Sequence, residues 1–181
     1  MRVDVTTWYL EMLEEGQLRP ALSDSPNLVV IQTEVPSPEF SRFLYSSVGG
    51  NWYWLDRLDW TYNRWLDYLK RPEVQTWVAY VSGTPAGYIE LESQPGSNVE
   101  IAYFGILQQF TGQRIGGHLL SVGVRQAWAI GARRVWVHTC SLDGPYALAN
   151  YQARGFQLYL EETHIEEVPD KPIGPWIGAY P

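Results

Sequence analysis

The sequence predicts an α+β fold, in which helices cover both faces of a mixed, mostly antiparallel central sheet. Two observations carry this prediction. Residues 75–107 alternate with a period of two around the turn Ser82-Gly83-Thr84-Pro85, which indicates a run of antiparallel strands. A long helical segment then precedes a buried strand, Arg133–Thr139, and this join is long enough for a right-handed parallel crossover.

The first part of the chain predicts one strand and two helices. The apolar run NLVVIQT, Asn27–Thr33, lies between two proline-containing turns and is typical of a short buried strand. Glu39–Val48 follows as a helix. Asp59–Leu69 is expected to be a second helix, because aromatic and leucine side chains recur in it at helical spacing and Pro72 closes it.

The second part predicts three strands and two further helices. Val99–Leu107 follows the turn PGSN and completes the antiparallel run. A helix is expected over about Gln113–Ile130, with Gly131 as its stop, and a short helix begins at Pro145. Phe156–Thr163 is the last expected strand. We expect one domain over residues 1–181 with a core of about 27–163, an N-terminal helix and a C-terminal tail.

Composition excludes several classes of protein. The net charge of −7 disfavours nucleic acid as a partner and mildly favours cationic substrates. No apolar run approaches the roughly 20 residues of a membrane span, and the acidic N-terminus is unlike a signal peptide, so we expect a soluble, cytoplasmic protein without membrane contact. Cys140 is the only cysteine and there are three histidines, so no disulfide and no metal site are expected.

The stretch FTGQRIGGHLL places Gly112, Gly116 and Gly117 at the start of the long helix. A glycine inside a helix costs about 0.5–1 kcal/mol relative to alanine. Bare amides at a helix N-terminus bind phosphates well, because they lack internal partners and lie at the positive end of the dipole. The alternative is that the glycines allow tight packing of helix on sheet. A P-loop is excluded, because no Gly-Lys-Ser/Thr ending follows.

Two motifs together resemble the GNAT superfamily of acyl-CoA-dependent N-acyltransferases. The segment Thr111–Gly116 resembles the family pattern Gln/Arg-x-x-Gly-x-Gly/Ala, with Thr111 and Arg114 as departures from it. About 40 residues later, ALANYQARGF resembles the family's short helix ending in Tyr-x-x-x-Gly-Phe, here Tyr151 and Gly155-Phe156. The resemblance covers roughly residues 27–163 and implies the GNAT fold.

The resemblance also implies a site for acetyl-CoA. Amides from Thr111 to Gly117 would hold the pyrophosphate, and the strand around Gly105 would splay from its parallel neighbour to bind pantetheine. A backbone N–H near Phe104 would polarise the thioester carbonyl. Gly105 is otherwise interpreted as a bulge or a packing kink. The implied cofactor-binding residues are Phe104, Ile106, Leu107, Thr111, Gly112, Gln113, Arg114, Ile115, Gly116 and Gly117.

Acyl transfer to an amine needs a base and an acid. Glu90 and Glu100, on neighbouring expected strands, are the candidate bases, directly or through a water, and Glu100 is expected to share a face with Ala102 and Phe104. Either glutamate is otherwise a solvated strand residue. Tyr151 stands where the family's general acid stands; the alternative is that it packs under Phe156.

Four further side chains are candidate site residues. Cys140 lies near the expected sulfur site but has no partners that would make it a nucleophile. His138 is interpreted as a packed or supporting histidine rather than a base. Trp52 and Trp54 either form a wall that recognises an amine or belong to the core.

The hypothesis is therefore an acetyl-CoA-dependent N-acetyltransferase that acts on a primary amine, small molecule or peptide, by direct attack in a ternary complex. The alternative is an acyl-CoA-binding sensor or scaffold without turnover. A homodimer is left open as the assembly.

Overall fold

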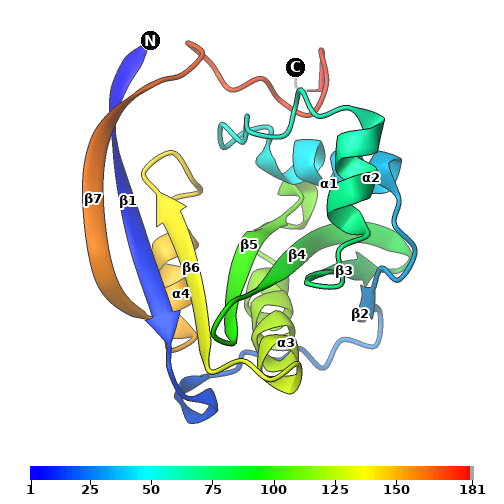
Figure 1. The fold of residues 1–181 in the computed structure, drawn as a ribbon. Coiled ribbons are helices and arrows are strands. Elements are labelled where there is room, and N and C mark those ends of the chain that lie inside the picture. Colours follow the sequence, from blue (N-terminus) through cyan, green and yellow to red (C-terminus); the bar gives the residue numbers. More distant parts are fainter. Residues whose placement is uncertain (180–181) are drawn as a thin grey trace.

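Seven strands form one mixed sheet in the computed structural model, which describes residues 1–179 (Figure 1). The strands are β1 (Arg2–Met12), β2 (Leu28–Gln32), β3 (Val74–Val81), β4 (Thr84–Gln94), β5 (Asn98–Ile106), β6 (Arg134–Cys140) and β7 (Gln157–Glu167). Their order across the sheet is β2-β3-β4-β5-β6-β1-β7. All neighbours are antiparallel except β5 and β6, which are parallel.

Helices cover both faces of this sheet, as expected. They are α1 (Pro38–Gly49), α2 (Tyr62–Leu69), α3 (Ile115–Ala129) and α4 (Ala147–Ala153), with 3₁₀ turns at Glu15–Gln17 and Gln108–Phe110. Leu119 and Val124 of α3 share the main buried cluster with Ile89 of β4. Leu44 of α1 belongs to a second cluster, with Tyr88 of β4 on the opposite face.

The expected N-terminal helix is wrong, because residues 2–12 form β1 inside the sheet. This strand pairs with β6 along one edge and with β7 along the other. Val5, Leu10 and Met12 are buried. The segment's local pattern is compatible with either element, and pairing with strands more than 120 residues away decides for a strand.

The other expected elements are confirmed with shifted boundaries. Helix α2 begins at Tyr62 rather than Asp59, because the Thr61 hydroxyl caps it by accepting a hydrogen bond from the Arg64 N–H at 3.3 Å. Strand β7 continues beyond Thr163 to Glu167, alongside β1. The expected parallel crossover is confirmed as the path from β5 through α3 to β6.

The parallel pair parts after three residues. Asn98, Val99 and Glu100 pair with Arg134, Val135 and Trp136, and beyond them β5 and β6 diverge (Figure 1). The sheet therefore has two arms, β2-β3-β4-β5 and β6-β1-β7, which meet along this short seam.

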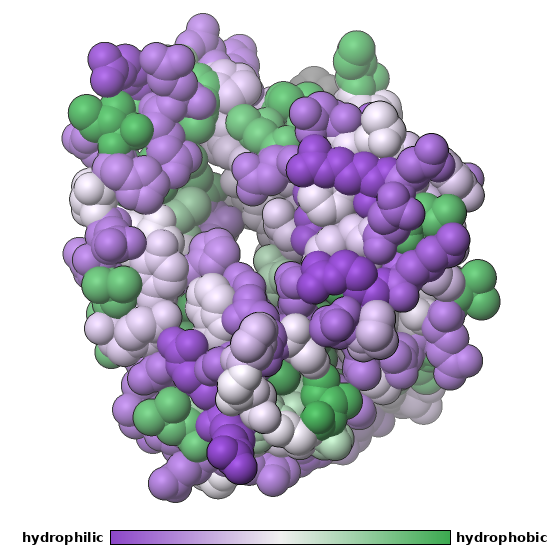
Figure 2. All heavy atoms as spheres, in the orientation of Figure 1, coloured by the Kyte–Doolittle hydropathy of each residue, from purple (hydrophilic) through white to green (hydrophobic). Residues whose placement is uncertain are grey.

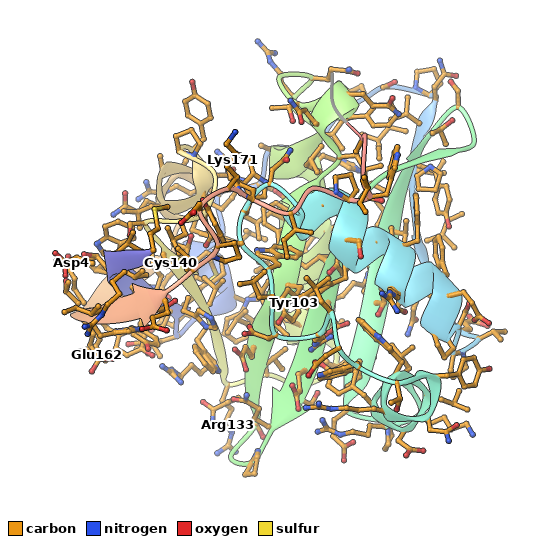
Figure 3. All side chains as sticks on the ribbon, turned by 90° about the horizontal axis from the view of Figure 1, so that it is seen from above. Asp4, Tyr103, Arg133, Cys140, Glu162 and Lys171 are labelled. Atoms are coloured by element: carbon orange, nitrogen blue, oxygen red, sulfur yellow. The ribbon has the colours of Figure 1, made fainter. Side chains whose placement is uncertain are left out.

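A C-terminal tail connects the two arms where both chain ends lie (Figure 1). At its start, the Val168 N–H donates to the Met1 carbonyl at 3.0 Å. Further on, the Gly174 N–H donates to the carbonyl of Gly50, at the end of α1, at 2.9 Å. Figure 3 shows from above how the tail, which includes Lys171, runs from β7 to α1. Residues 180 and 181, the end of the expected tail, lie outside the described residues. Within residues 1–179, no helix is both long and apolar enough to cross a membrane.

Candidate active site

A cleft of about 1620 Å³ opens where β5 and β6 diverge. Figure 2 shows the surface hollowed between the two arms. The α1–α2 loop, the start of α3 and helix α4 complete its walls. The expected site residues that line it are Trp52, Trp54, Glu100, Phe104, Ile106, Thr111, Gly112, Arg114, Ile115, Gly116, Gly117 and Tyr151.

Three expected site residues do not line this cleft. Leu107 packs with the buried cluster on the α1 face of the sheet. The Gln113 side chain donates to the carbonyl of Gln109 at 3.1 Å. Glu90 is only 2% exposed and lies beneath the α1–α2 loop.

The loop before α3 presents its backbone to the cleft. Gly112 has φ of +82°, and Arg114, the residue before the helix, is also left-handed with φ of +63°. The Arg114 side chain makes no capping hydrogen bond. The amides of Ile115, Gly116 and Gly117 form the first turn and therefore have no partner inside the helix. This arrangement can receive an anionic group.

The glycines of this loop have different physical causes. A Cβ on Gly117 would lie 2.8 Å from an Arg154 nitrogen and 3.1 Å from the Ala21 Cβ, so tight packing explains that glycine. A Cβ on Gly116 would meet nothing closer than Ile106 at 3.6 Å, an ordinary contact. The protein itself therefore has room for a side chain at position 116, on the wall of the cleft.

Gly105 and the bulge of β5 are separate features. A Cβ on Gly105 would collide with the Val48 side chain, so this glycine lets α1 approach the sheet. The bulge lies at Ala102, because Glu90 pairs with Tyr103 while Leu91 pairs with Ile101. The expectation that Glu100 shares a face with Phe104 is consequently wrong: the extra residue places Glu100 on the face of Tyr103.

Tyr151 lies in the cleft wall at 5% exposure, between the rings of Phe104 and Phe156. Burial, and after it the charge of Asp143, raises the pKa of Tyr151. The phenol therefore keeps its proton throughout the neutral range. Gly155 supports this position, because its φ is +101° and a Cβ there would collide with the Gln17 carbonyl.

Glu100 is the expected base that faces the cleft. One carboxylate oxygen accepts a hydrogen bond from the Gln94 side chain at 2.7 Å, and the other lies 3.6 Å from His138 Nδ1. Gln94 in turn accepts a hydrogen bond from the Trp136 indole at 3.0 Å. The carboxylate is therefore held in one orientation at the point where the strands part.

Glu90 is instead engaged in a buried ion pair. Its carboxylate accepts hydrogen bonds from the Arg57 guanidinium at 2.9 Å and from the Tyr68 hydroxyl at 2.7 Å. The guanidinium lies over the rings of Tyr68 and Tyr103, 4.2 and 4.3 Å from their centres. This cluster fixes the α1–α2 loop to the sheet.

The same loop places Trp52 and Trp54 on the wall of the cleft. The Trp54 ring packs 4.9 Å from that of Tyr103, and its indole N–H donates to Asp143 at 3.4 Å. Asp143 also accepts from the Thr139 hydroxyl at 2.6 Å. Sequence reasoning assigned no role to Asp143; its place directly after a buried strand, before Gly-Pro, is the signal that could have found it.

Cys140 is not poised as a nucleophile. Burial, and after it the charge of Asp143, raises the pKa of the Cys140 thiol to about 11. It therefore remains protonated near neutral pH. Among residues 1–179, no group of three or more His, Cys, Asp or Glu side chains could hold a metal ion.

A scan against family models matches residues 37–156 to the acetyltransferase (GNAT) family. The matched segment is about two thirds of the chain and includes the β5–β6 seam, the α3 loop and α4. The chain belongs to the GNAT family. No curated protein matches this GNAT chain significantly.

Solved structures share its fold at low identity. A GCN5-related N-acetyltransferase from Kribbella flavida superposes with a TM-score of 0.66 at 18% identity, over 91% of this chain and 59% of that one. One from Sphaerobacter thermophilus gives 0.63 at 17%, over 89% and 50%. An aminoglycoside acetyltransferase from an uncultured soil metagenomic sample, in complex with sisomicin, gives 0.60 at 15%, over 71% and 87%. This chain thus spans less than two thirds of the first two proteins.

Proposed function

We propose that this GNAT protein is an acetyl-CoA-dependent N-acetyltransferase, in which a primary amine attacks the thioester directly in a ternary complex. The observation that carries the proposal is Gly116. It is a glycine on the wall of the cleft, at the open start of a helix, with room for a side chain that the protein does not use. Such a position suits the close approach of a ligand to the backbone.

The residues of the cleft fit acetyl-CoA as the acyl donor. The left-handed loop and the first amides of α3, with Thr111 and the Arg114 guanidinium, would hold the pyrophosphate. Phe104 and Ile106 line the diverging edge of β5, where main-chain groups beyond Glu100 have no partner on β6 and suit a pantetheine amide. The bound donor supplies an activated acetyl thioester, and an N–H near Phe104 is suited to stabilise its oxygen as charge develops there.

The two proton transfers fall to different sides of the cleft. Tyr151, buried and protonated, would donate to the leaving sulfur. On the acceptor side, Glu100 favours loss of the amine proton. Carboxylates and the Trp52 and Trp54 rings favour a cationic acceptor, either a small molecule or a peptide. We expect the protein to act in the cytoplasm without nucleic acid or membrane, and a homodimer remains part of this proposal.

The test is amine-dependent release of free thiol from acetyl-CoA. We expect Tyr151→Phe to lower kcat by about 10²-fold or more, the usual contribution of a general acid, while the acetyl-CoA Kd measured by calorimetry stays within about twofold. Tyr62→Phe, a change on exposed α2, is the matched control. Unchanged turnover in Tyr151→Phe would remove Tyr151 as the acid. Tight acetyl-CoA binding with no thiol release on any amine would instead indicate a sensor or scaffold.

A further inference from the structure

His138 stands on β6 just beyond the point where β5 and β6 part. The last pair of the seam is Glu100 with Trp136, and His138 follows two residues later on the same face. Its ring lies 6.1 Å from that of Trp136 and 5.9 Å from that of Tyr9 on the neighbouring strand. Both His138 and Glu100 line the cleft.

A chain of polar contacts fixes the geometry of this pair. The Trp136 indole donates to Gln94, Gln94 donates to one oxygen of Glu100, and the other oxygen of Glu100 faces His138 Nδ1. A carboxylate at Nδ1 favours the tautomer that carries its proton there. The second ring nitrogen, Nε2, has no hydrogen bond to any of residues 1–179. This leaves Nε2 as a lone-pair acceptor on a residue of the cleft wall.

Three other carboxylates near this point have different partners. Glu90 is buried against Arg57, and Glu92 pairs with Arg71 at 2.7 Å. Asp143 accepts hydrogen bonds from Thr139 and from the Cys140 N–H. Glu100 has the His138 ring in front of it rather than a guanidinium, so the arrangement is that of a base oriented by a carboxylate.

We propose that His138 Nε2 takes the proton from the acceptor amine, and that Glu100 is the positioning residue that holds the ring; this inference rests on the proposed function. The ammonium loses one proton to Nε2, and the freed lone pair forms the N–C bond as the C–S bond breaks. The leaving thiolate takes the Tyr151 proton. The new amide nitrogen then loses its second proton, which returns to the Tyr151 phenolate and leaves the phenol protonated again. His138, with its side chain 48% exposed, releases its proton to solvent.

The surroundings set the pH at which this base works. The polar contact with the Glu100 carboxylate raises the pKa of His138, and the charges of Asp143 and Asp56 act in the same direction, against burial. The titratable Tyr9 on β1 also faces the ring. Activity should therefore rise with pH through a limb above 6.5, the ordinary value for histidine, since only the neutral ring accepts a proton.

The test compares pH profiles of kcat/KM for thiol release in His138→Gln, Glu100→Gln and the control His164→Gln. His164 pairs with Glu166 at 2.8 Å on exposed β7 and offers the same chemical pair away from the proposed machinery. We expect His138→Gln to lower kcat by about 10²-fold or more and to abolish the limb. Glu100→Gln should retain turnover within about tenfold and move the limb toward pH 6.5, because the carboxylate no longer favours the charged ring. His164→Gln should change neither.

Two outcomes overturn the inference. One is a His138→Gln protein that keeps the limb; the other is loss of turnover in Glu100→Gln alone, which would make Glu100 the base. NMR titration of the His138 ring gives a readout independent of turnover: its pKa should fall in Glu100→Gln, and an unchanged value contradicts the positioning role. If the unsubstituted protein binds acetyl-CoA but releases no thiol with any amine, the proposed function fails instead.

Discussion

Gly116, in the first turn of α3, destabilises the helix relative to alanine, and no close contact inside the protein requires a glycine there. Gly112 is explained by its left-handed backbone, and Gly117 by its close packing against Ala21 and Arg154. Gly116 has a helical backbone and space for a Cβ. The cause of that glycine therefore lies in whatever occupies the cleft.

Gly116→Val separates binding from folding. We expect the free energy of unfolding to change by less than about 1 kcal/mol, because a Cβ at this position makes only ordinary contacts and valine is no worse than glycine in a helix. The acetyl-CoA Kd should rise about tenfold, equivalent to about 1.4 kcal/mol, because the branched side chain holds the ligand off the amides. Urea unfolding and calorimetry measure the two quantities.

Gly16→Val is the matched control, since a Cβ at Gly16 meets nothing within 4 Å and lies outside the cleft. It should leave both quantities unchanged. An unchanged acetyl-CoA Kd in folded Gly116→Val protein would contradict the assignment of this helix start to the pyrophosphate.

Among the elements, the α1–α2 loop is held by side chains, Arg57 and Trp54 among them, rather than by regular structure. Arg57, 6% exposed, enters the space between the loop and the sheet and meets Glu90 among four aromatic rings. The loop also carries Trp52 and Trp54. The positions of Trp52 and Trp54 on the cleft wall therefore depend in part on this buried ion pair.

Glu90→Gln should lower the free energy of unfolding by about 3–5 kcal/mol, because it leaves a buried guanidinium without its counter-charge. Glu92→Gln removes one of the two carboxylates that pair with Arg71, which is 42% exposed, and should cost less than about 1 kcal/mol. Chemical unfolding of both variants measures this difference. Equal, small losses would show that Arg57 does not depend on Glu90.

At the scale of the whole molecule, two arms meet along three residue pairs and are linked again by the tail. The tail reaches α1 through the hydrogen bond from Gly174 to Gly50. A Cβ on Gly50 would lie 2.5 Å from the Gly174 carbonyl carbon, so this contact requires a bare position. The tail is therefore a second, weaker connection between the arms.

Gly50→Ala should loosen that connection selectively. Residue 50 has an ordinary helical backbone with φ of −58°, so the backbone itself admits alanine. A Cβ there would press on the tail and also lie 2.6 Å from the Ser46 carbonyl oxygen, so the last turn of α1 has to adjust as well. We expect the Gly174 and Ala179 amides to exchange with solvent about tenfold faster, while those of β3 and β4 keep their rates. Hydrogen exchange measures this. Equal acceleration in β3 would mean that the change weakens the whole fold instead.

Local pattern was enough to predict six of the strands and all four helices, because each combines a clear period with its own turn or cap. It failed for β1, whose pairing partners lie more than 120 residues away. The resemblance to the GNAT family, rather than local pattern, predicted Gly116 and Tyr151 as site residues, and both line the cleft. Local pattern could not exclude Glu90 from the cleft, because the burial of that strand residue depends on Arg57 from a distant loop. It also placed Glu100 on the wrong face, because the bulge residue Ala102 reverses the alternation of β5.

The position of β1 between β6 and β7 also has a consequence for synthesis. The arm β2-β3-β4-β5 is one continuous piece of chain and can pair as it emerges, whereas β1 emerges first and finds its partners last. Between Met12 and Arg134 lie some 120 residues, which take about 6–24 s to translate at roughly 5–20 residues per second. During that time β1 remains unpaired on the nascent chain. The arm β6-β1-β7 can form only after the final quarter of the sequence has been synthesised.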